Sequence, residues 1–141
     1  MTKRSAKSPL CPACGNGKLL YRARAGRTFE YKGFEYPIPA TLKLVECDAC
    51  HEMPLTPAEV AEIEGPIAEL HRGRMASLVD DALRRLEVHM TIGEIERALH
   101  LSQGYLARAR TKGEPSFPLA ALLYLLAQHP KNLGELQRLS G

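Results

Sequence analysis

The four cysteines of this chain occur as two Cys-x-x-Cys pairs, Cys11–Cys14 and Cys47–Cys50, and these are its only cysteines. A Cys-x-x-Cys turn holds two sulfurs on one side of a tight loop, so two such turns supply four thiolates to one tetrahedral Zn²⁺. The pairs are separated by 32 residues, more than the common zinc template has, so the prediction depends on the doubled pair and its flanks. Gly15 follows the first pair, where the backbone must fold back toward sulfur, and His51 follows the second. We therefore predict a structural zinc site whose ligands are Cys11, Cys14, Cys47 and Cys50.

Two other uses of the cysteines stay open at this point. They are a pair of disulfides or a redox-active Cys-x-x-Cys, and an iron–sulfur or rubredoxin-like iron centre. Residues 1–10 are rich in Lys, Arg and Ser, and no apolar segment typical of a secretion signal follows them. We therefore expect reduced thiols, which favours metal binding. A catalytic zinc normally keeps an open coordination position, which four cysteine ligands would fill.

Charge is distributed unevenly along the 141 residues, which favours two small domains over one. Lys and Arg outnumber Asp and Glu by nine to four in residues 1–50 and by ten to seven in residues 72–141, whereas residues 51–71 contain five Glu and no Lys or Arg. The expected division is a zinc-binding domain at 1–55, a helical linker at 56–72 and a DNA-binding domain at 73–141. The net charge of +3 permits nucleic-acid binding without requiring it.

Between the cysteine pairs, apolar and polar residues alternate as they do in strands. The alternation covers residues 18–25 and 27–38, with turn signals at Gly26 and at Lys32-Gly33, and a further short strand covers residues 40–46. This pattern predicts a small antiparallel sheet whose open end is closed by the metal. Such a module has too little core to fold alone, so zinc binding would supply its folding free energy.

The remaining sequence predicts helices. Thr56-Pro57-Ala58-Glu59 is a capping box with proline at the first helical position, and Gly65-Pro66 is expected to break or kink the helix that starts there. From Ile67 to Leu86, apolar residues recur at spacings of three and four, as in an amphipathic helix. No stretch approaches the roughly 20 apolar residues of a membrane span, so we expect a soluble cytoplasmic protein without membrane contact.

From residue 91 onward the chain predicts a run of short helices. A second capping box, Thr91 to Glu94, opens a helix over residues 92–99, and Ser102 is a suitable N-cap for a helix over residues 103–110. Two short helices joined by so brief a turn are typical of helix-turn-helix. Pro118 is expected to start an apolar helix that stops before Pro130, and a capping box at 132–135 to open the last helix. Five helices in about 70 residues is the plan of a repressor-type DNA-binding domain, so the predicted fold class is α+β.

The helix over residues 103–110 is the candidate DNA-reading element. Leu106 fits a core position, which leaves the N-terminal turn and the arginines facing outward. Gln can pair with adenine and Arg with guanine, whereas Tyr can donate to a phosphate or pack on a thymine methyl, and Lys suits a phosphate. The alternative is an ordinary solvated helix face. The candidate DNA-contacting residues are Gln103, Gly104, Tyr105, Arg108, Arg110 and Lys112.

An enzyme fits the sequence poorly. Outside the predicted zinc site we find no Ser/His/Asp or Cys/His arrangement, no glycine-rich phosphate loop and no paired carboxylates. Glu94 and Glu96 are interpreted as a helix cap and a surface charge. The expectation is a protein without catalytic activity.

The two parts together resemble the MqsA/YgiT-type antitoxins, which join an N-terminal zinc-binding domain to a C-terminal Xre-type helix-turn-helix. The resemblance covers nearly the whole chain and is carried by CPACG at 11–15, CDACHE at 47–52 and TIGEIERALHLSQGYLARARTKGEPS at 91–116, followed by a leucine-rich helix. It implies a structural zinc, an N-terminal domain that neutralises a ribosome-independent mRNA-cleaving toxin, and a C-terminal domain that forms a homodimer, binds a palindromic operator and represses its own operon.

The chain departs from the family pattern in the helix-turn-helix. Ile92 stands where Xre domains often have Gln, and Tyr105 stands where the family's recognition helix commonly has Asn. An alternative reading is a regulator with the same zinc and DNA-binding parts but no toxin partner.

Overall fold

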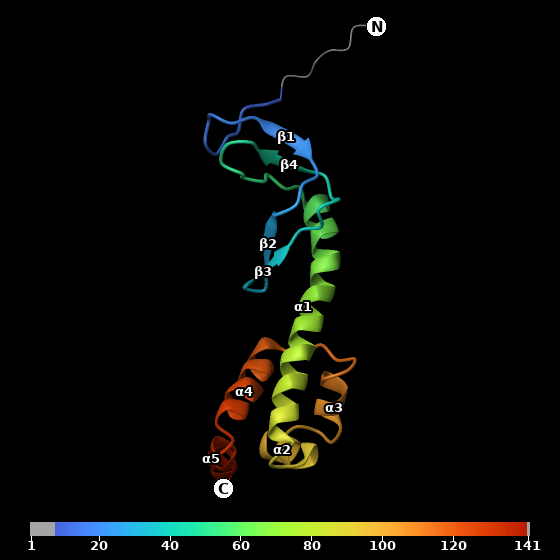
Figure 1. The fold of residues 1–141 in the computed structure, drawn as a ribbon, viewed down its shortest axis with the longest axis vertical. Coiled ribbons are helices and arrows are strands. Elements are labelled where there is room, and N and C mark those ends of the chain that lie inside the picture. Colours follow the sequence, from blue (N-terminus) through green and yellow to red (C-terminus); the bar gives the residue numbers. More distant parts are fainter. Residues whose placement is uncertain (1–7, 141) are drawn as a thin grey trace, which may run out of the picture. The chain divides into compact units, whose positions relative to one another are not determined.

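The computed structural model describes residues 8–140, in which four strands precede five helices (Figure 1). The chain divides into two compact units, an N-terminal unit that ends at Ala68 and a C-terminal unit that starts at Glu69. This boundary falls inside the segment expected to be a helical linker. The predicted α+β class is confirmed: a small β unit that holds the cysteines is followed by helices. Of the Lys/Arg/Ser-rich stretch at 1–10, residues 1–7 lie outside the described part.

The N-terminal unit contains two separate two-stranded antiparallel sheets, so the prediction of one small sheet was wrong in this respect. Strand β1 pairs with β4, which places Leu19 opposite Cys47, and β2 pairs with β3 across the Lys32-Gly33 turn. The two turn residues have φ of 50° and 83°, as a tight hairpin requires. The strands are β1 Leu19–Arg22, β2 Thr28–Tyr31, β3 Phe34–Pro37 and β4 Leu44–Cys47.

Arg27 explains why the predicted strands do not merge into one sheet. Its side chain is 3% exposed and lies between the sheets, where Nη1 donates to the carbonyl oxygen of Arg22 at 3.1 Å and Nη2 donates to that of Leu42 at 2.5 Å. Gly26, with φ of 87°, turns the chain just before it. The bound carbonyl groups lie at the end of β1 and just before β4, where a longer β1–β4 pair would continue.

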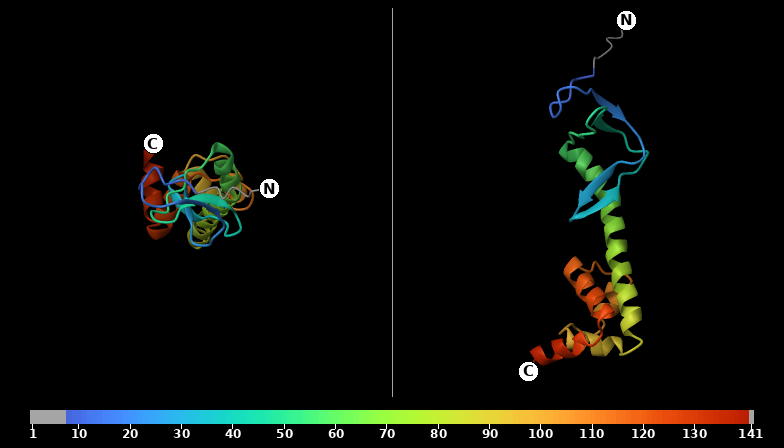
Figure 2. Two further views of the ribbon diagram at one scale, coloured as in Figure 1. Left: turned by 90° about the horizontal axis from the view of Figure 1, so that it is seen from above. Right: turned by 60° about the vertical axis from the view of Figure 1, so that its left-hand side comes forward.

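The core of the N-terminal unit forms where the β2–β3 hairpin meets the first turns of α1, which lie beside each other in Figures 1 and 2. Helix α1 spans Pro57–Leu86 and contributes two fully buried isoleucines. The buried residues of this cluster are Tyr36, Ile38, Leu44, Ile63 and Ile67.

Helix α1 starts as predicted but does not break at Gly65-Pro66. The Thr56 hydroxyl accepts from the Glu59 N–H at 3.3 Å, and the Glu59 carboxylate accepts from the Thr56 N–H at 2.8 Å, which confirms the capping box. Pro66 lies inside the continuous helix, so the expectation of a break there was wrong. Proline removes one hydrogen bond of the helix, but Ile63 and Ile67 on either side of it are both fully buried, and their packing holds the backbone helical.

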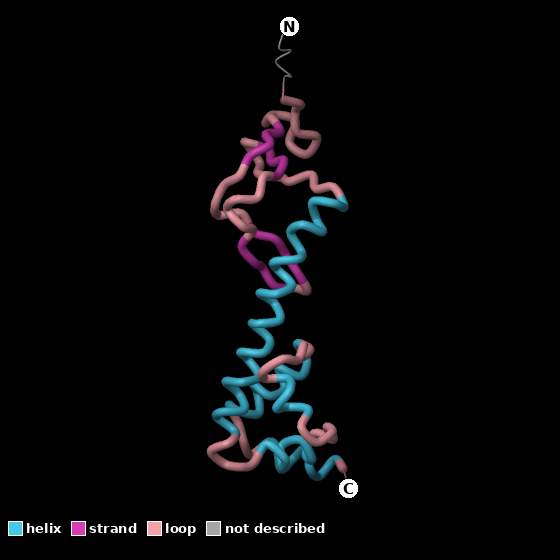
Figure 3. Tube along the Cα trace, turned by 90° about the vertical axis from the view of Figure 1, so that its right-hand side faces the viewer, coloured by secondary structure: helices cyan, strands magenta, loops and turns pink. Residues whose placement is uncertain are grey.

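The C-terminal unit packs four further helices, joined by short loops, around the later turns of α1 (Figure 3). Its core includes Val79, Leu83 and Leu86 from α1, together with Ile95, Leu106 and Leu123 from three of the other helices. The helices after α1 are α2 Ile92–Ala98, α3 Tyr105–Ala109, α4 Phe117–Gln128 and α5 Asn132–Leu139.

The observed N-cap agrees with the predicted one in α2 and differs from it in α3 and α5. Both bonds of the predicted capping box at Thr91 and Glu94 are present. Helix α3 begins at Tyr105 because Gly104, with φ of 80°, cannot belong to a right-handed helix, so the prediction of Ser102 as its N-cap was wrong. The predicted capping box at 132–135 is also absent from α5, whose N-cap is Lys131 without a side-chain bond.

Candidate metal centre and candidate DNA interface

The four cysteine sulfurs form one cluster in which all lie within 4.8 Å of one another. Two contacts join the pairs: Sγ of Cys11 lies 3.7 Å from Sγ of Cys50, and Sγ of Cys14 lies 3.7 Å from Sγ of Cys47. A tetrahedral ion with metal–sulfur bonds of about 2.3 Å separates its ligands by about 3.8 Å. The donor set and its spacing therefore fit one tetrahedral metal ion, as the sequence predicts.

Backbone N–H groups turn toward the sulfurs, as they must to stabilise negative charge there. The N–H of Gly17 donates to Sγ of Cys14 at 3.4 Å, and with the Asn16 N–H it lowers the pKa of Cys14 to about 6. The Glu52 N–H acts in the same direction on Cys50, but desolvation and the three neighbouring sulfurs outweigh it and raise the pKa of Cys50 to about 12. Four thiolates this close repel one another unless a cation lies between them, so the cluster as a set favours a bound metal ion.

The two cysteine turns have the same backbone geometry. Gly15 and His51, four residues after the first cysteine of each pair, donate to its carbonyl oxygen at 2.9 and 3.2 Å, and both have left-handed φ, 72° and 62°. Glycine takes this conformation freely, whereas histidine takes it at a cost. The His51 side chain is exposed and is not part of the cysteine cluster.

Gly17 is a residue of this site that the sequence analysis missed. A Cβ on Gly17 would collide with the sulfur of Cys47 and lie 2.9 Å from Oδ1 of Asp48. The second cysteine turn thus packs directly against the bare backbone that follows the first. The sequence signal is the second glycine in Gly15-Asn16-Gly17, because only the first is needed for the turn itself.

Glu46, directly before Cys47, anchors β4 to β1. Its side chain is 1% exposed, and Arg24 binds it with two contacts, Nε to Oε1 at 2.7 Å and Nη2 to Oε2 at 2.6 Å. Arg22 adds a contact at 3.1 Å. The bond from Arg24 is the main reason that the pKa of Glu46 falls to about 2, against the raising effect of burial. This charged pairing fixes the strand that delivers one metal ligand, and no periodicity in the sequence reveals it.

The candidate DNA-contacting residues divide into two groups in the C-terminal unit. Gln103, Tyr105, Arg108 and Lys112 are exposed, and Gly104 is half-buried. Gln103 precedes α3 in a turn instead of lying within the helix. Leu106 is fully buried, which confirms its predicted core position. Tyr105, Arg108 and Lys112 meet around one hollow of about 320 Å³ at the end of α3.

Arg110 belongs to the second group because it is turned toward α1. Its Nε and Nη2 both lie 2.8 Å from Oδ1 of Asp80, and its Nη1 lies 2.7 Å from Oε1 of Glu87. The side chain is 16% exposed, and although burial acts to lower its pKa, the Glu87 and Asp80 carboxylates together raise it. Arg110 thus neutralises two acidic groups of its own chain.

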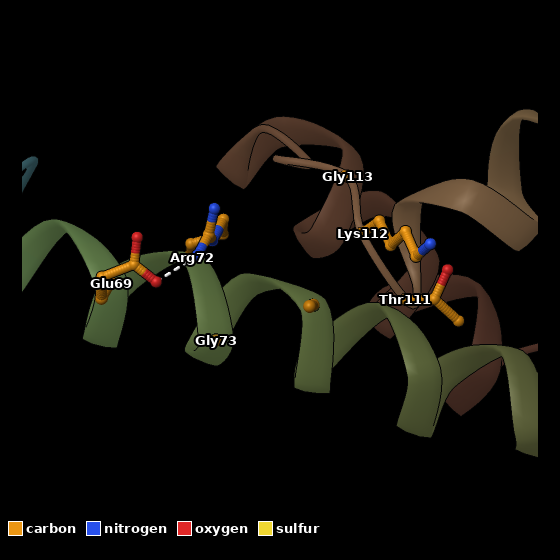
Figure 4. A pocket seen from close by; sticks show the side chains of 7 residues that line it. Glu69, Arg72, Gly73, Thr111, Lys112 and Gly113 are labelled. Atoms are coloured by element: carbon orange, nitrogen blue, oxygen red, sulfur yellow. Dashed lines mark hydrogen bonds and ion pairs between the residues drawn. The ribbon is translucent and has the colours of Figure 1, made fainter.

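Lys112 also lines a second hollow, of about 370 Å³, between α1 and the loop after α3 (Figure 4). Arg72, on the opposite wall, is ion-paired with Glu69 and lies 3.9 Å from Glu114, so its charge is already balanced. Among the described residues that line this hollow, Lys112 has no ion pair and is the cation available to a phosphate.

Glu96 was interpreted as a surface charge, and the structure shows this to be wrong. Its side chain is 4% exposed, with Oε1 accepting from the Gly104 N–H at 3.2 Å and Oε2 accepting from the Leu106 N–H at 3.0 Å. Glu94, two positions earlier, forms the predicted cap. No local pattern in α2 reveals this role, because the two amides belong to another part of the fold.

No protein-family model matches the chain, and no curated protein matches it significantly. The cysteine cluster, the small β unit and the helical unit are compatible with the plan of the MqsA/YgiT-type antitoxins. Within residues 8–140, no helix is both long enough and apolar enough to cross a membrane.

Proposed function

We propose that the chain is a DNA-binding transcriptional repressor that serves as the antitoxin of a toxin–antitoxin pair. The observation that carries the DNA-binding part is the outward side of α3, where Tyr105, Arg108 and Lys112 surround one hollow and Gln103 precedes the helix. These residue types contact base edges and phosphates, and the N-terminal part of a recognition helix is where base contacts occur. Arg110 is left out of this set because Asp80 and Glu87 hold it.

We further propose that the metal is Zn²⁺ and that its role is structural. Four cysteine thiolates at tetrahedral spacing are a zinc donor set, and they leave no position for a substrate. Cys11, Cys14, Cys47 and Cys50 would hold the ion, and the Gly17 N–H and the Glu46 pairing would orient two of the ligands. The ion would supply folding free energy to a unit with a small core, and no catalytic role is assigned.

The proposed repressor is a homodimer formed through the C-terminal unit, and α4 offers the surface for it. This helix has no charged residue, and Phe117, Tyr124 and Leu125 are 50%, 49% and 58% exposed. Their exposed parts amount to about 300 Å² per copy, the size expected for the apolar centre of an interface that buries about 800 Å² per partner. A second copy suits this surface because a two-fold dimer presents two recognition helices about 34 Å apart to a palindrome.

The dimer is tested by measuring the mass of the full-length protein by light scattering. Leu125→Glu should convert a dimer to a monomer, whereas Val88→Glu, at an apolar residue that is 78% exposed outside α4, should leave the mass unchanged. A wild-type monomer across the micromolar range would contradict the assignment.

DNA binding is tested with the duplex that wild-type protein selects from a random-sequence library. Arg108→Ala should weaken binding about tenfold to a hundredfold, as loss of a base contact does. Lys112→Ala should weaken binding to all duplexes alike. It should also reduce the slope of log affinity against log salt concentration by about one. Arg138→Ala is the control, because that side chain is 77% exposed on α5 and paired with Glu135. Full retention of specific binding by Arg108→Ala would exclude α3 as the reading helix.

The toxin partner is proposed from the order of the two units. The cysteine-containing unit precedes the helical unit, as in the MqsA/YgiT-type antitoxins. The test is co-expression with the product of the adjacent gene, followed by a growth assay and co-purification. Rescue of growth and a stable complex would support the antitoxin role. DNA binding without rescue or complex would favour the alternative, a stand-alone regulator that uses the same C-terminal unit.

A further inference from the structure

Helix α3 is too short to be stable, or to keep a fixed orientation, without contacts to other helices. It has only five residues, Tyr105–Ala109, and a helix this short is far below the length at which isolated helices persist in water. Its N-cap is Gly104, which makes no side-chain cap bond. The orientation of α3 must therefore come from contacts with neighbouring helices.

Glu96 supplies the cap that α3 lacks, and it does so from α2. Each carboxylate oxygen accepts one backbone N–H at the start of α3, from Gly104 at 3.2 Å and from Leu106 at 3.0 Å. A carboxylate suits this place because the first N–H groups of a helix have no partner within it and carry partial positive charge. Because Glu96 is 4% exposed, water cannot replace these two bonds without opening the unit.

Arg110 fixes the other end of α3 to α1. It follows the last residue of the helix and binds Asp80 and Glu87 at 2.7–2.8 Å. The planar guanidinium contacts Asp80 within α1 and Glu87 directly after its last residue, which restrains rotation of α3 as well as its distance. Both ends of the exposed segment that carries Tyr105 and Arg108 are thus tied to other helices by charged groups.

We propose that Glu96 is a positioning residue for DNA recognition, which sets the orientation of α3 through the Gly104 and Leu106 amides, with Arg110 as its counterpart at the other end. This inference depends on the proposed function, because it concerns how the same helix reads DNA. Its consequence is that losing Glu96 should reduce discrimination between DNA sequences more than it reduces binding to DNA in general, since phosphate contacts tolerate a misaligned helix and base contacts do not.

The test compares Glu96→Gln and Glu96→Ala with Glu94→Ala in the zinc-loaded full-length protein. Glutamine keeps the shape of Glu96 but offers one acceptor instead of two, and alanine offers none. Glu94→Ala is the matched control, because it removes the cap bond to the Thr91 N–H in the same helix without touching α3. Affinities are measured for the duplex selected by wild-type protein and for a scrambled duplex of equal composition, and each is corrected for the folded fraction.

Glu96→Gln should reduce the ratio of specific to non-specific affinity about tenfold, and Glu94→Ala should change it less than twofold. A ratio that Glu96→Gln leaves unchanged would overturn the proposal. Amide hydrogen exchange gives a readout that needs no DNA: the Leu106 amide should be protected in wild type and lose protection selectively in Glu96→Gln. An unprotected Leu106 amide in wild type would also overturn the proposal, even if the Glu96 variants failed to fold.

The two proposals can fail separately. If wild-type protein selects no duplex, the proposed function fails, and the positioning role in recognition fails with it. If wild type selects a duplex but the Glu96 variants keep the wild-type ratio, only the positioning role is refuted. Arg110→Lys provides a second variant, since one ammonium cannot replace both contacts of the guanidinium, and it should lower the same ratio.

Discussion

Replacing Arg110 with methionine measures how strongly the ion pairs at the end of α3 stabilise the C-terminal unit. Methionine keeps an unbranched side chain but removes the guanidinium that pairs with Asp80 and Glu87. The side chains of Arg110, Asp80 and Glu87 are 16%, 26% and 34% exposed, so the network is intermediate between core and surface. Exposed ion pairs contribute about 0.2–1 kcal/mol, and removing one partner of a buried pair costs about 3–5 kcal/mol. Because Asp80 keeps Arg84 at 2.9 Å, we expect a loss of about 2 kcal/mol.

The assay is urea unfolding of zinc-loaded full-length protein, followed by circular dichroism at 222 nm. In a heating experiment the same loss lowers the midpoint by about 10 °C for a unit of this size. Arg108→Met is the matched control, because it removes an exposed arginine two positions earlier, in α3, and should change the free energy of unfolding by no more than about 0.5 kcal/mol. Equal stability of the two variants would refute the view that Arg110 has a structural role and would return it to the candidate DNA contacts.

Three further predictions concern the N-terminal unit. Removal of the metal by a chelator should unfold this unit while α2–α5 keep their amide exchange protection, and persistent protection of β1 and β4 would contradict it. Gly17→Ala should weaken metal binding about tenfold or more in a chelator competition, because the new Cβ collides with the Cys47 sulfur, whereas Gly65→Ala, which has open space on α1, should not. Glu46→Gln should lower the free energy of unfolding by about 2 kcal/mol in urea, since it leaves Arg24 without its buried partner, and an unchanged midpoint would refute that role.

Features that are determined by a few adjacent residues could be predicted from the sequence. The cysteine cluster and the two capping boxes at Thr56 and Thr91 are of this kind, because a Cys-x-x-Cys turn or a four-residue box fixes its geometry locally. The order of strands and helices follows from the alternation and spacing of apolar residues along the chain. These motifs place the candidate metal ligands without any knowledge of how the elements pack.

Features decided by packing could not be predicted in the same way. Pro66 normally ends a helix, but two buried isoleucines hold α1 together around it. The two sheets separate because Arg27 binds carbonyl groups that a longer strand would have used. Glu96 is a buried cap only because the N-terminus of α3 happens to face it. In each case the deciding partner lies on another element of the fold.

Arg108 in α3 and Arg110 directly after it illustrate how helix geometry assigns different roles to identical residues. Successive residues of a helix are about 100° apart, so Arg108 and Arg110 point about 200° apart, whereas Arg110 lies within about 40° of Leu106, four positions earlier. Leu106 is fully buried, so the face that carries it into the core must also turn Arg110 inward. A cation in that position needs carboxylates, which come from Asp80 on α1 and from Glu87, directly after the end of α1. Once Leu106 is placed in the core, helix periodicity therefore leaves Arg108 exposed as a candidate DNA contact and turns Arg110 toward the carboxylates.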